Sequence, residues 1–189
     1  MRGEYARLGW TNATRDEVLT EFAMVIRQHV QLGVSAGING KYYRTMPRDA
    51  QKRMGDPQRF VFSRCLRLLI DKLREREHDV PVALIFDDDE KYAMKCYADL
   101  ADIKRGNADV KARVGSVCFG NHRVVQALQG ADVLAYLSLR YLKAQLAGGS
   151  APIHFEQLLR SPEPAYGIEY ASELWDADEM RQRFVNSET

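Results

Sequence analysis

Residues 81–90 read PVALIFDDDE, an apolar run that ends in three aspartates and a glutamate. A continuous apolar run with Val and Ile is typical of a strand that is covered on both faces of its sheet. A second short run, VGSVCF at 114–119, has the same character, and the helical pattern KYAMKCYADLADIK lies between the two. The succession of strand, helix and strand predicts an α/β fold with a mixed sheet flanked by helices.

Periodic apolar residues predict further elements on both sides of this core. We expect helices at about 15–31, 60–77, 123–146 and 177–185, and a strand near 34–43. Thr14 with Glu17 and Asp176 with Glu179 have the spacing of capping boxes, which open the first and last of these helices. Residues 153–159, IHFEQLL, fit a strand as well as a helix.

The chain has one clear break, the stretch AGGS at 147–150. It predicts a domain over residues 1–146 and a C-terminal extension over 151–189.

Arg64, Arg67 and Arg74 lie beside the apolar stripe of the predicted helix 60–77. We interpret them as a solvated flank with ion pairs along the helix rather than as a phosphate-binding face.

Composition narrows the classes of function. The 27 Lys+Arg against 26 Asp+Glu leave no basic excess, which counts mildly against a nucleic-acid binder without excluding one. Three widely spaced cysteines without a C-x-x-C pair predict neither a zinc site nor a disulfide framework. No apolar run approaches the roughly 18–20 residues that cross a bilayer, and MRGEYARLGW lacks the apolar core of a secretory signal. We therefore expect a cytoplasmic protein without a membrane partner.

Asp87 directly follows the predicted strand 81–86. Ligand sites of open α/β sheets lie beyond the carboxyl ends of strands, so a carboxylate at this point is well placed for chemistry. The alternative is that it caps the helix that follows. Three consecutive aspartates exceed what one cap needs, and both interpretations stay open.

Asp132 is a carboxylate within the otherwise apolar segment VVQALQGADVLAYLSLRYLK at 124–143. On a helix it shares a stripe with Leu128, Ala135 and Leu139, which predicts that it faces inward. No basic residue lies three or four positions away to neutralise it. A buried carboxylate pairs, accepts hydrogen bonds or holds a metal ion, and Mg²⁺ is usually held by one or two carboxylates. Bonding to the backbone or to a nearby Tyr or Ser is the alternative.

Two inward carboxylates, Asp87 and Asp132, would make half of a metal-dependent phosphoryl-transfer site. Aspartate is the expected ligand of hard ions such as Mg²⁺ or Mn²⁺, and Asp88 is a candidate auxiliary ligand, as is Asp89. Gln129 is a candidate to orient a water molecule, although an amide that packs between helices explains it as well. His122 is a candidate proton shuttle, with a capping or surface role as the alternative.

At these residues the chain resembles a bacterial and phage family known as domain of unknown function 3800. The likeness rests on IFDDDEKY at 85–92, VCFGNH at 117–122 and QALQGADVLAYLSLR at 126–140. It implies a ribonuclease-H-like fold and a metal-dependent nuclease. On this resemblance Asp87 is the acid after the fourth strand, and Asp132 is the acid on the last core helix.

The chain departs from the family pattern at its start. Family members begin with a strand that ends in Asp-Glu-Ser-Gly and supplies the central acid, and this motif is absent. We therefore expect an N-terminally incomplete ribonuclease-H-like sheet, from a shortened chain or a late gene start, or a sheet that a partner chain or a second copy completes.

Two functional hypotheses follow. The first is a nuclease that cleaves phosphodiester bonds of nucleic acid with Mg²⁺ or Mn²⁺ held by Asp87, Asp132 and Asp88. The second is a non-catalytic accessory or binding protein that keeps the fold without a complete active site. A small-molecule enzyme is set aside, because the sequence has no glycine-rich phosphate loop, no G-x-S-x-G and no H-E-x-x-H.

Overall fold

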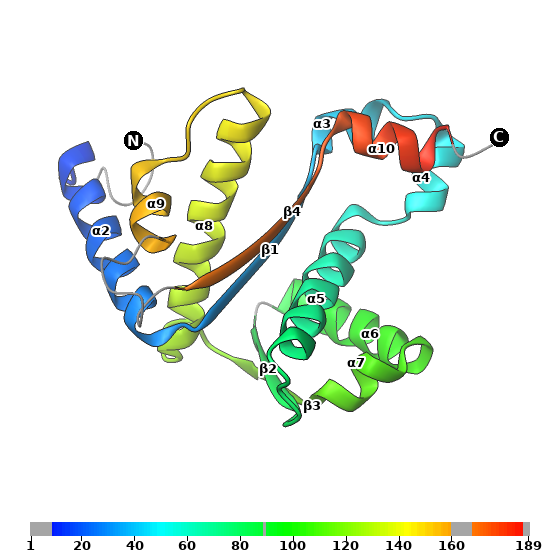
Figure 1. Cartoon of the computed structure of the whole chain (residues 1–189), viewed down its shortest axis with the longest axis horizontal. Helices are drawn as coiled ribbons and strands as arrows, with labels where there is room; N and C mark the ends of the chain where they lie inside the picture. Colours follow the sequence, from blue (N-terminus) through cyan, green and yellow to red (C-terminus); the bar gives the residue numbers. More distant parts are fainter. Residues whose placement is uncertain (1–8, 89, 160–167, 187–189) are drawn as a thin grey trace. The chain divides into compact units, whose positions relative to one another are not determined.

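The computed structural model describes residues 9–88, 90–159 and 168–186, and its helices and strands are shown in Figure 1. The chain forms two compact units, each built from two segments. Unit 1 takes residues 1–33 and 130–170, and unit 2 takes residues 34–129 and 171–189. Helices combine with strands in two short pairs, which confirms the α/β class. Among the described residues, no helix combines the length and apolarity that a membrane crossing requires.

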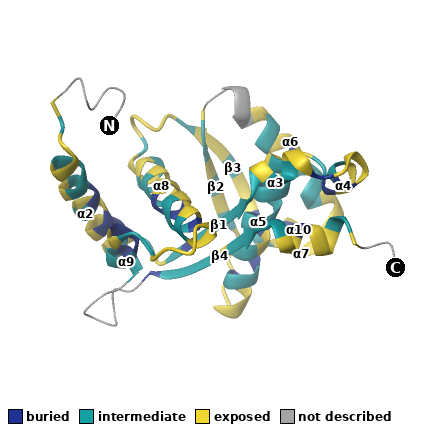
Figure 2. Cartoon of the chain, turned by 90° about the horizontal axis from the view of Figure 1, so that it is seen from above, coloured by how far each residue is buried: buried dark blue, intermediate teal, exposed yellow. Residues whose placement is uncertain are grey.

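Unit 1 is a small helical assembly around an apolar core that contains Phe155. Its helices are α2 (Asn12–His29), α9 (Ile153–Leu159) and the greater part of α8 (Gln126–Leu146). The buried residues of α2 and α9 lie where these helices face each other (Figure 2). Phe155 is 1% exposed at the centre of this core, stacked on Tyr141 with ring centroids 4.4 Å apart. Such burial of apolar surface is the main force that holds a unit of this size together.

Strands β1 (Leu32–Ile38) and β4 (Glu169–Trp175) form a two-stranded pair, and the division between the units runs through both. The N–H of Glu169 donates to the carbonyl of Gln31, and the N–H of Asn39 donates to the carbonyl of Trp175. The starts and the ends of the strands therefore meet, so the pair is parallel. The predicted strand near 34–43 stops earlier, because the Asn39 side chain caps a short helix, α3 (Gly40–Thr45).

Unit 2 contains the strand–helix–strand core that the sequence predicts. Its strands are β2 (Val82–Asp87) and β3 (Val114–Gly120), and its longer helices are α5 (Pro57–Glu75) and α6 (Glu90–Gly106). Shorter helices complete it, namely α4 (Arg48–Met54), α7 (Ala108–Arg113) and α10 (Ala177–Phe184). Leu66, Ile70 and Leu100 are buried between α5, α6 and the strands.

Strands β2 and β3 pair in parallel, with Asp87 opposite Gly120 at their carboxyl ends. Within the described part of unit 2, only one face of β2 is covered: Leu84 and Phe86 pack into the core of unit 2, while Ala83 is exposed and Ile85 is 45% exposed. The prediction that this strand is covered on both faces is therefore wrong. An unbroken apolar run cannot show which face the helices cover, because it lacks the alternation that marks a half-covered strand.

The helix ends agree in part with the expected caps. Asp176 and Glu179 form the predicted capping box of α10. The first helix instead begins at Asn12, where the Thr11 side chain accepts from the backbone N–H of Thr14, so Thr14 is not the cap. Arg67 and Arg74 form ion pairs along α5 as interpreted from the sequence, since both contact Asp71, whereas Arg64 pairs with Glu173 of β4 instead.

Candidate functional site

The candidate site lies at the carboxyl ends of β2 and β3, entirely within unit 2. Parallel strands end at the same edge of a sheet, so residues that follow them along the chain become neighbours. The N–H of Asp88 donates to the carbonyl of Gly120 at 3.1 Å, which carries the strand pairing one step past Asp87. Asp87 and the loop that begins at Asn121 are thus held side by side.

Asn121 fixes the loop between β3 and α8. Its side-chain Oδ1 accepts from the N–H of Arg123, and its carbonyl accepts from the N–H groups of Val124 and Val125, all at 2.9 Å. Gly120 precedes it where a Cβ would lie 2.9 Å from a methyl group of Val125, so this position has no room for a side chain. The result is a tight turn that leaves the residue after Asn121 at the edge of the sheet.

That residue is His122, and it contacts Asp87. Its Nδ1 lies 3.1 Å from Oδ1 and 3.2 Å from Oδ2 of the Asp87 carboxylate. The side-chain amide of Gln129 donates to the carbonyl of His122 at 2.9 Å and so anchors the turn from α8. The His122 and Asp87 side chains are 47% and 40% exposed, which leaves the pair open to a ligand.

The geometry decides which nitrogen of His122 can react. A carboxylate accepts hydrogen bonds and does not donate them, so in the neutral imidazole the proton lies on Nδ1. The lone pair is then on Nε2, the nitrogen that does not contact Asp87. A carboxylate that orients a histidine in this way prepares the second nitrogen to accept a proton or to ligate a metal ion.

Contact with His122 also affects the acidity of Asp87. The hydrogen bond from His122, together with its charge when protonated, holds the pKa of the Asp87 carboxyl below its ordinary value of 3.8. A carboxyl whose pKa is lower in the folded chain stabilises the fold above its unfolded pKa. That stabilisation is lost as the pH falls through the folded pKa.

We expect an NMR titration of the Asp87 carboxyl to give a pKa below 3.8, and the variant His122→Gln to return it toward that value. Asp56 provides the control, because its pKa is lowered by its own contacts with Arg59 and Lys95 and should not change in that variant. An Asp87 pKa that is the same in both proteins would show that the two side chains do not interact in solution.

The remaining predicted site residues are placed as follows. Asp88 is exposed next to Asp87, and Asp89 lies outside the described residues. Asp132 belongs to unit 1, so the structure does not bring it together with Asp87 within one unit. The prediction that Asp132 faces inward is wrong, because the residue is exposed.

The covered face of α8 in unit 1 is a different one from the stripe that contains Asp132. Leu137 and Ser138 are buried, whereas Ala135 is exposed and Leu139 is 50% exposed. The helix carries apolar residues around most of its circumference, so the periodicity alone could not choose the buried side.

As possible metal ligands, the side chains of Asp87 and His122 suit a hard metal ion only in part. Asp87 offers carboxylate oxygens, which Mg²⁺ and Mn²⁺ prefer, and His122 offers an imidazole nitrogen. Among the described residues, no group of three or more His, Cys, Asp or Glu side chains is placed to hold a metal ion. A cation bound at Asp87 would therefore keep several water ligands, as Mg²⁺ in proteins usually does.

Comparison with known proteins finds no matching family model, no similar curated protein and no solved structure of similar fold.

No functional role was predicted for two further residues of this loop. The Asn121 side chain holds the turn, and the exposed Arg123 follows His122 within it. The pattern VCFGNHR contains a sign of this turn, since Gly-Asn after a strand is a common turn pair. The contact between Asp87 and His122 was not predicted, although both residues were candidates for the site.

Proposed function

We propose that the protein is a metal-dependent hydrolase of phosphodiester bonds, of ribonuclease-H-like type, that acts on nucleic acid. The observation that carries the proposal is the contact between Asp87 and His122 at the carboxyl edge of the parallel strands. A carboxylate and an oriented imidazole, both open to solvent, supply a metal ligand and a proton acceptor. The resemblance of residues 85–92, 117–122 and 126–140 to the domain of unknown function 3800 family leads to the same proposal.

Each residue has a stated part in this mechanism. Asp87 would hold Mg²⁺ or Mn²⁺ through a carboxylate oxygen and still accept from His122 Nδ1, because a carboxylate has about four lone-pair sites. A bound metal ion would neutralise charge on the phosphate. His122 takes a proton from the attacking water at Nε2, and Gln129 keeps the ring in place through the His122 carbonyl. Asp88 and Asp132 remain sequence-based proposals for further ligands.

The test measures cleavage and metal binding together. Labelled single-stranded DNA, single-stranded RNA and an RNA–DNA hybrid are incubated with the protein in Mn²⁺ or Mg²⁺, and thermal unfolding is followed as the metal is added. We expect Asp87→Asn to abolish cleavage and to remove the stabilisation by Mn²⁺. Asp49→Asn is the control, because Asp49 is an exposed aspartate of α4 outside the site. Asp132→Asn tests separately whether that carboxylate belongs to the site.

A second candidate function is a non-catalytic accessory or binding protein. The observation that favours it is the lack, among described side chains, of a third ligating group beside Asp87 and His122. β2 and β3 each have one edge that no described strand pairs, which a partner chain or a second copy could extend. Nucleic-acid binding without cleavage in either metal, unchanged by Asp87→Asn, would favour this candidate and contradict the nuclease.

A further inference from the structure

A cavity of about 490 Å³ lies in unit 2, apart from Asp87 and His122, between the start of α5, the middle of α6 and the end of β1. Its wall is largely apolar and is formed by Ile38, Pro57, Val61 and Phe62. The volume lies within the range of about 300–1,000 Å³ that is typical of small-molecule sites. Its apolar wall suits the hydrophobic part of a small organic ligand.

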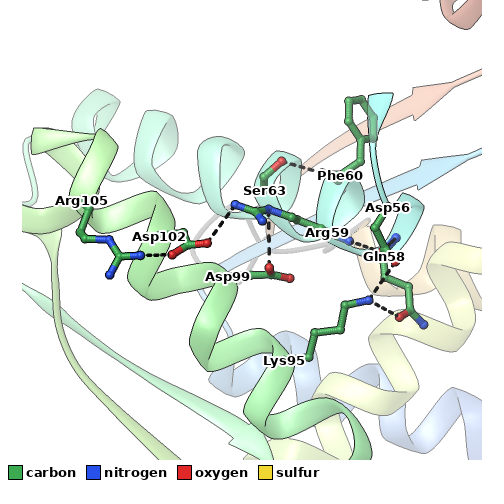
Figure 3. Close-up of polar contacts among 9 residues, drawn as sticks. All are labelled: Asp56, Gln58, Arg59, Phe60, Ser63, Lys95, Asp99, Asp102 and Arg105. Atoms are coloured by element: carbon green, nitrogen blue, oxygen red, sulfur yellow. Dashed lines mark hydrogen bonds and ion pairs between the residues drawn. The ribbon is translucent and has the colours of Figure 1, made fainter. Parts of the chain in front are cut away.

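Two charged residues of α6, Lys95 and Asp99, line this cavity, and their side chains differ in how well their hydrogen-bonding capacity is met. Lys95 donates from Nζ to Oδ2 of Asp56 at 3.0 Å and to Oε1 of Gln58 at 3.2 Å (Figure 3). Its ammonium group is thus held at the N-terminus of α5 by a carboxylate and an amide. A bound anion would have to compete with Asp56 for this cation.

Asp99 is the other charged side chain, and the residue is only 9% exposed. Its Oδ1 lies 3.5 Å from Nε of Arg59, too far for a good hydrogen bond. Arg59 is itself shared, since it also donates to Asp102, which in turn pairs with Arg105 (Figure 3). A carboxylate that is removed from water needs several hydrogen-bond donors to offset its lost hydration. The Arg59 guanidinium is distant and shared, so it offsets little of that loss.

We propose that this cavity binds a small organic cation, an amine with an aryl or alkyl body. The apolar body packs against Val61 and Phe62, and the ammonium group donates to the Asp99 carboxylate. A ligand with a carboxylate in place of the amine would meet Asp99 as a like charge. The Asp99 carboxylate and the apolar wall together therefore select a cationic, amphipathic molecule over a neutral or anionic one of the same shape.

Three probes of nearly equal size test the charge preference: 2-phenylethylamine, 2-phenylethanol and 3-phenylpropionate. Binding to the full chain is followed by the backbone amide shifts of residues 58–62 and 95–99. We expect the amine to bind about tenfold more tightly than the alcohol, and the carboxylate to bind least, because a hydrogen bond to a charged group is worth about this factor.

Two kinds of variant test the charge of Asp99 and the space in the cavity separately. Asp99→Asn should reduce the preference for the amine over the alcohol to less than about twofold. Asp102→Asn is the matched control, since Asp102 also contacts Arg59 but does not line the cavity, and it should keep the preference. Val61→Trp should block all three probes, and an amide spectrum of each variant checks the fold.

The proposal is overturned if none of the probes shifts these amides in the unmodified protein, or if the preference survives Asp99→Asn. If Val61→Trp does not fold, the comparison of the two aspartate variants decides the matter.

Discussion

His122→Ala is expected to lower phosphodiester cleavage about a thousandfold while leaving Mn²⁺ binding in place, because general acid–base catalysis by a positioned side chain contributes about 10²–10⁴-fold. The imidazole contacts Asp87 through Nδ1, and in the proposed mechanism Nε2 accepts the proton of the attacking water. Without the imidazole, Asp87 would still hold the proposed cation, but the water would have to lose its proton to solvent. The rate of metal-dependent cleavage at saturating Mn²⁺ measures this effect.

The pH profile distinguishes loss of proton transfer from loss of structure. In the unmodified protein the rate should fall in acid, where a protonated imidazole cannot act as a base. His122→Ala should remove this fall and leave a low, flatter profile. His78→Ala is the control, since His78 is an exposed residue after α5, and its profile should match that of the unmodified protein. A variant at His122 that cleaves at the full rate would contradict the assigned role.

The order of elements in unit 2 could be predicted from the sequence because its patterns are local. The apolar runs at 81–86 and 114–119 form β2 and β3, and the periodic segment between them forms α6. The meeting of Asp87 with His122 depends on the pairing of these strands, since Asp87 ends β2 and His122 lies two residues after β3. Sequence patterns indicated both residues as candidates, but they predicted Asp132, and not His122, as the partner of Asp87.

Other features depend on contacts that no local pattern encodes. β4, with the sequence EYASELW, was not predicted as a strand, because its two glutamates and its serine interrupt any apolar run. Arg64 neutralises one of these glutamates, Glu173, through two hydrogen bonds of 2.9 and 2.6 Å. The partners are more than a hundred residues apart, so neither residue by itself indicates the pair.

The assignment of Asp132 shows the same limit within a single helix. A carboxylate surrounded by apolar neighbours was taken as buried, but the apolar residues of α8 extend around the helix. Its covered face in unit 1 is the one that meets α2 and α9, where Leu137 is fully buried. Only the position of neighbouring helices decides which of several apolar stripes becomes the interior.

Phe155→Ala is expected to destabilise unit 1 by about 3–5 kcal/mol, the usual cost of removing a buried aromatic side chain. Phe155 is 1% exposed and stacks on Tyr141, and its ring also meets the ring of Tyr170 edge-on at 5.0 Å. The variant leaves a cavity between α2, α8 and α9 that these aromatic neighbours cannot fill without leaving their own positions. Urea unfolding followed by tryptophan fluorescence and far-ultraviolet circular dichroism measures the loss.

Ile153→Ala provides the matched control, because Ile153 begins the same helix and is 60% exposed. It should change the free energy of unfolding by less than about 0.5 kcal/mol. Hydrogen exchange adds a spatial test: in Phe155→Ala, protection should fall for the amides of α2 and α9, while those of α5 and α6, which belong to unit 2, should lose less. An effect at Phe155 no larger than that at Ile153 would mean that these helices do not pack around its ring, and that unit 1 lacks the core assigned to it.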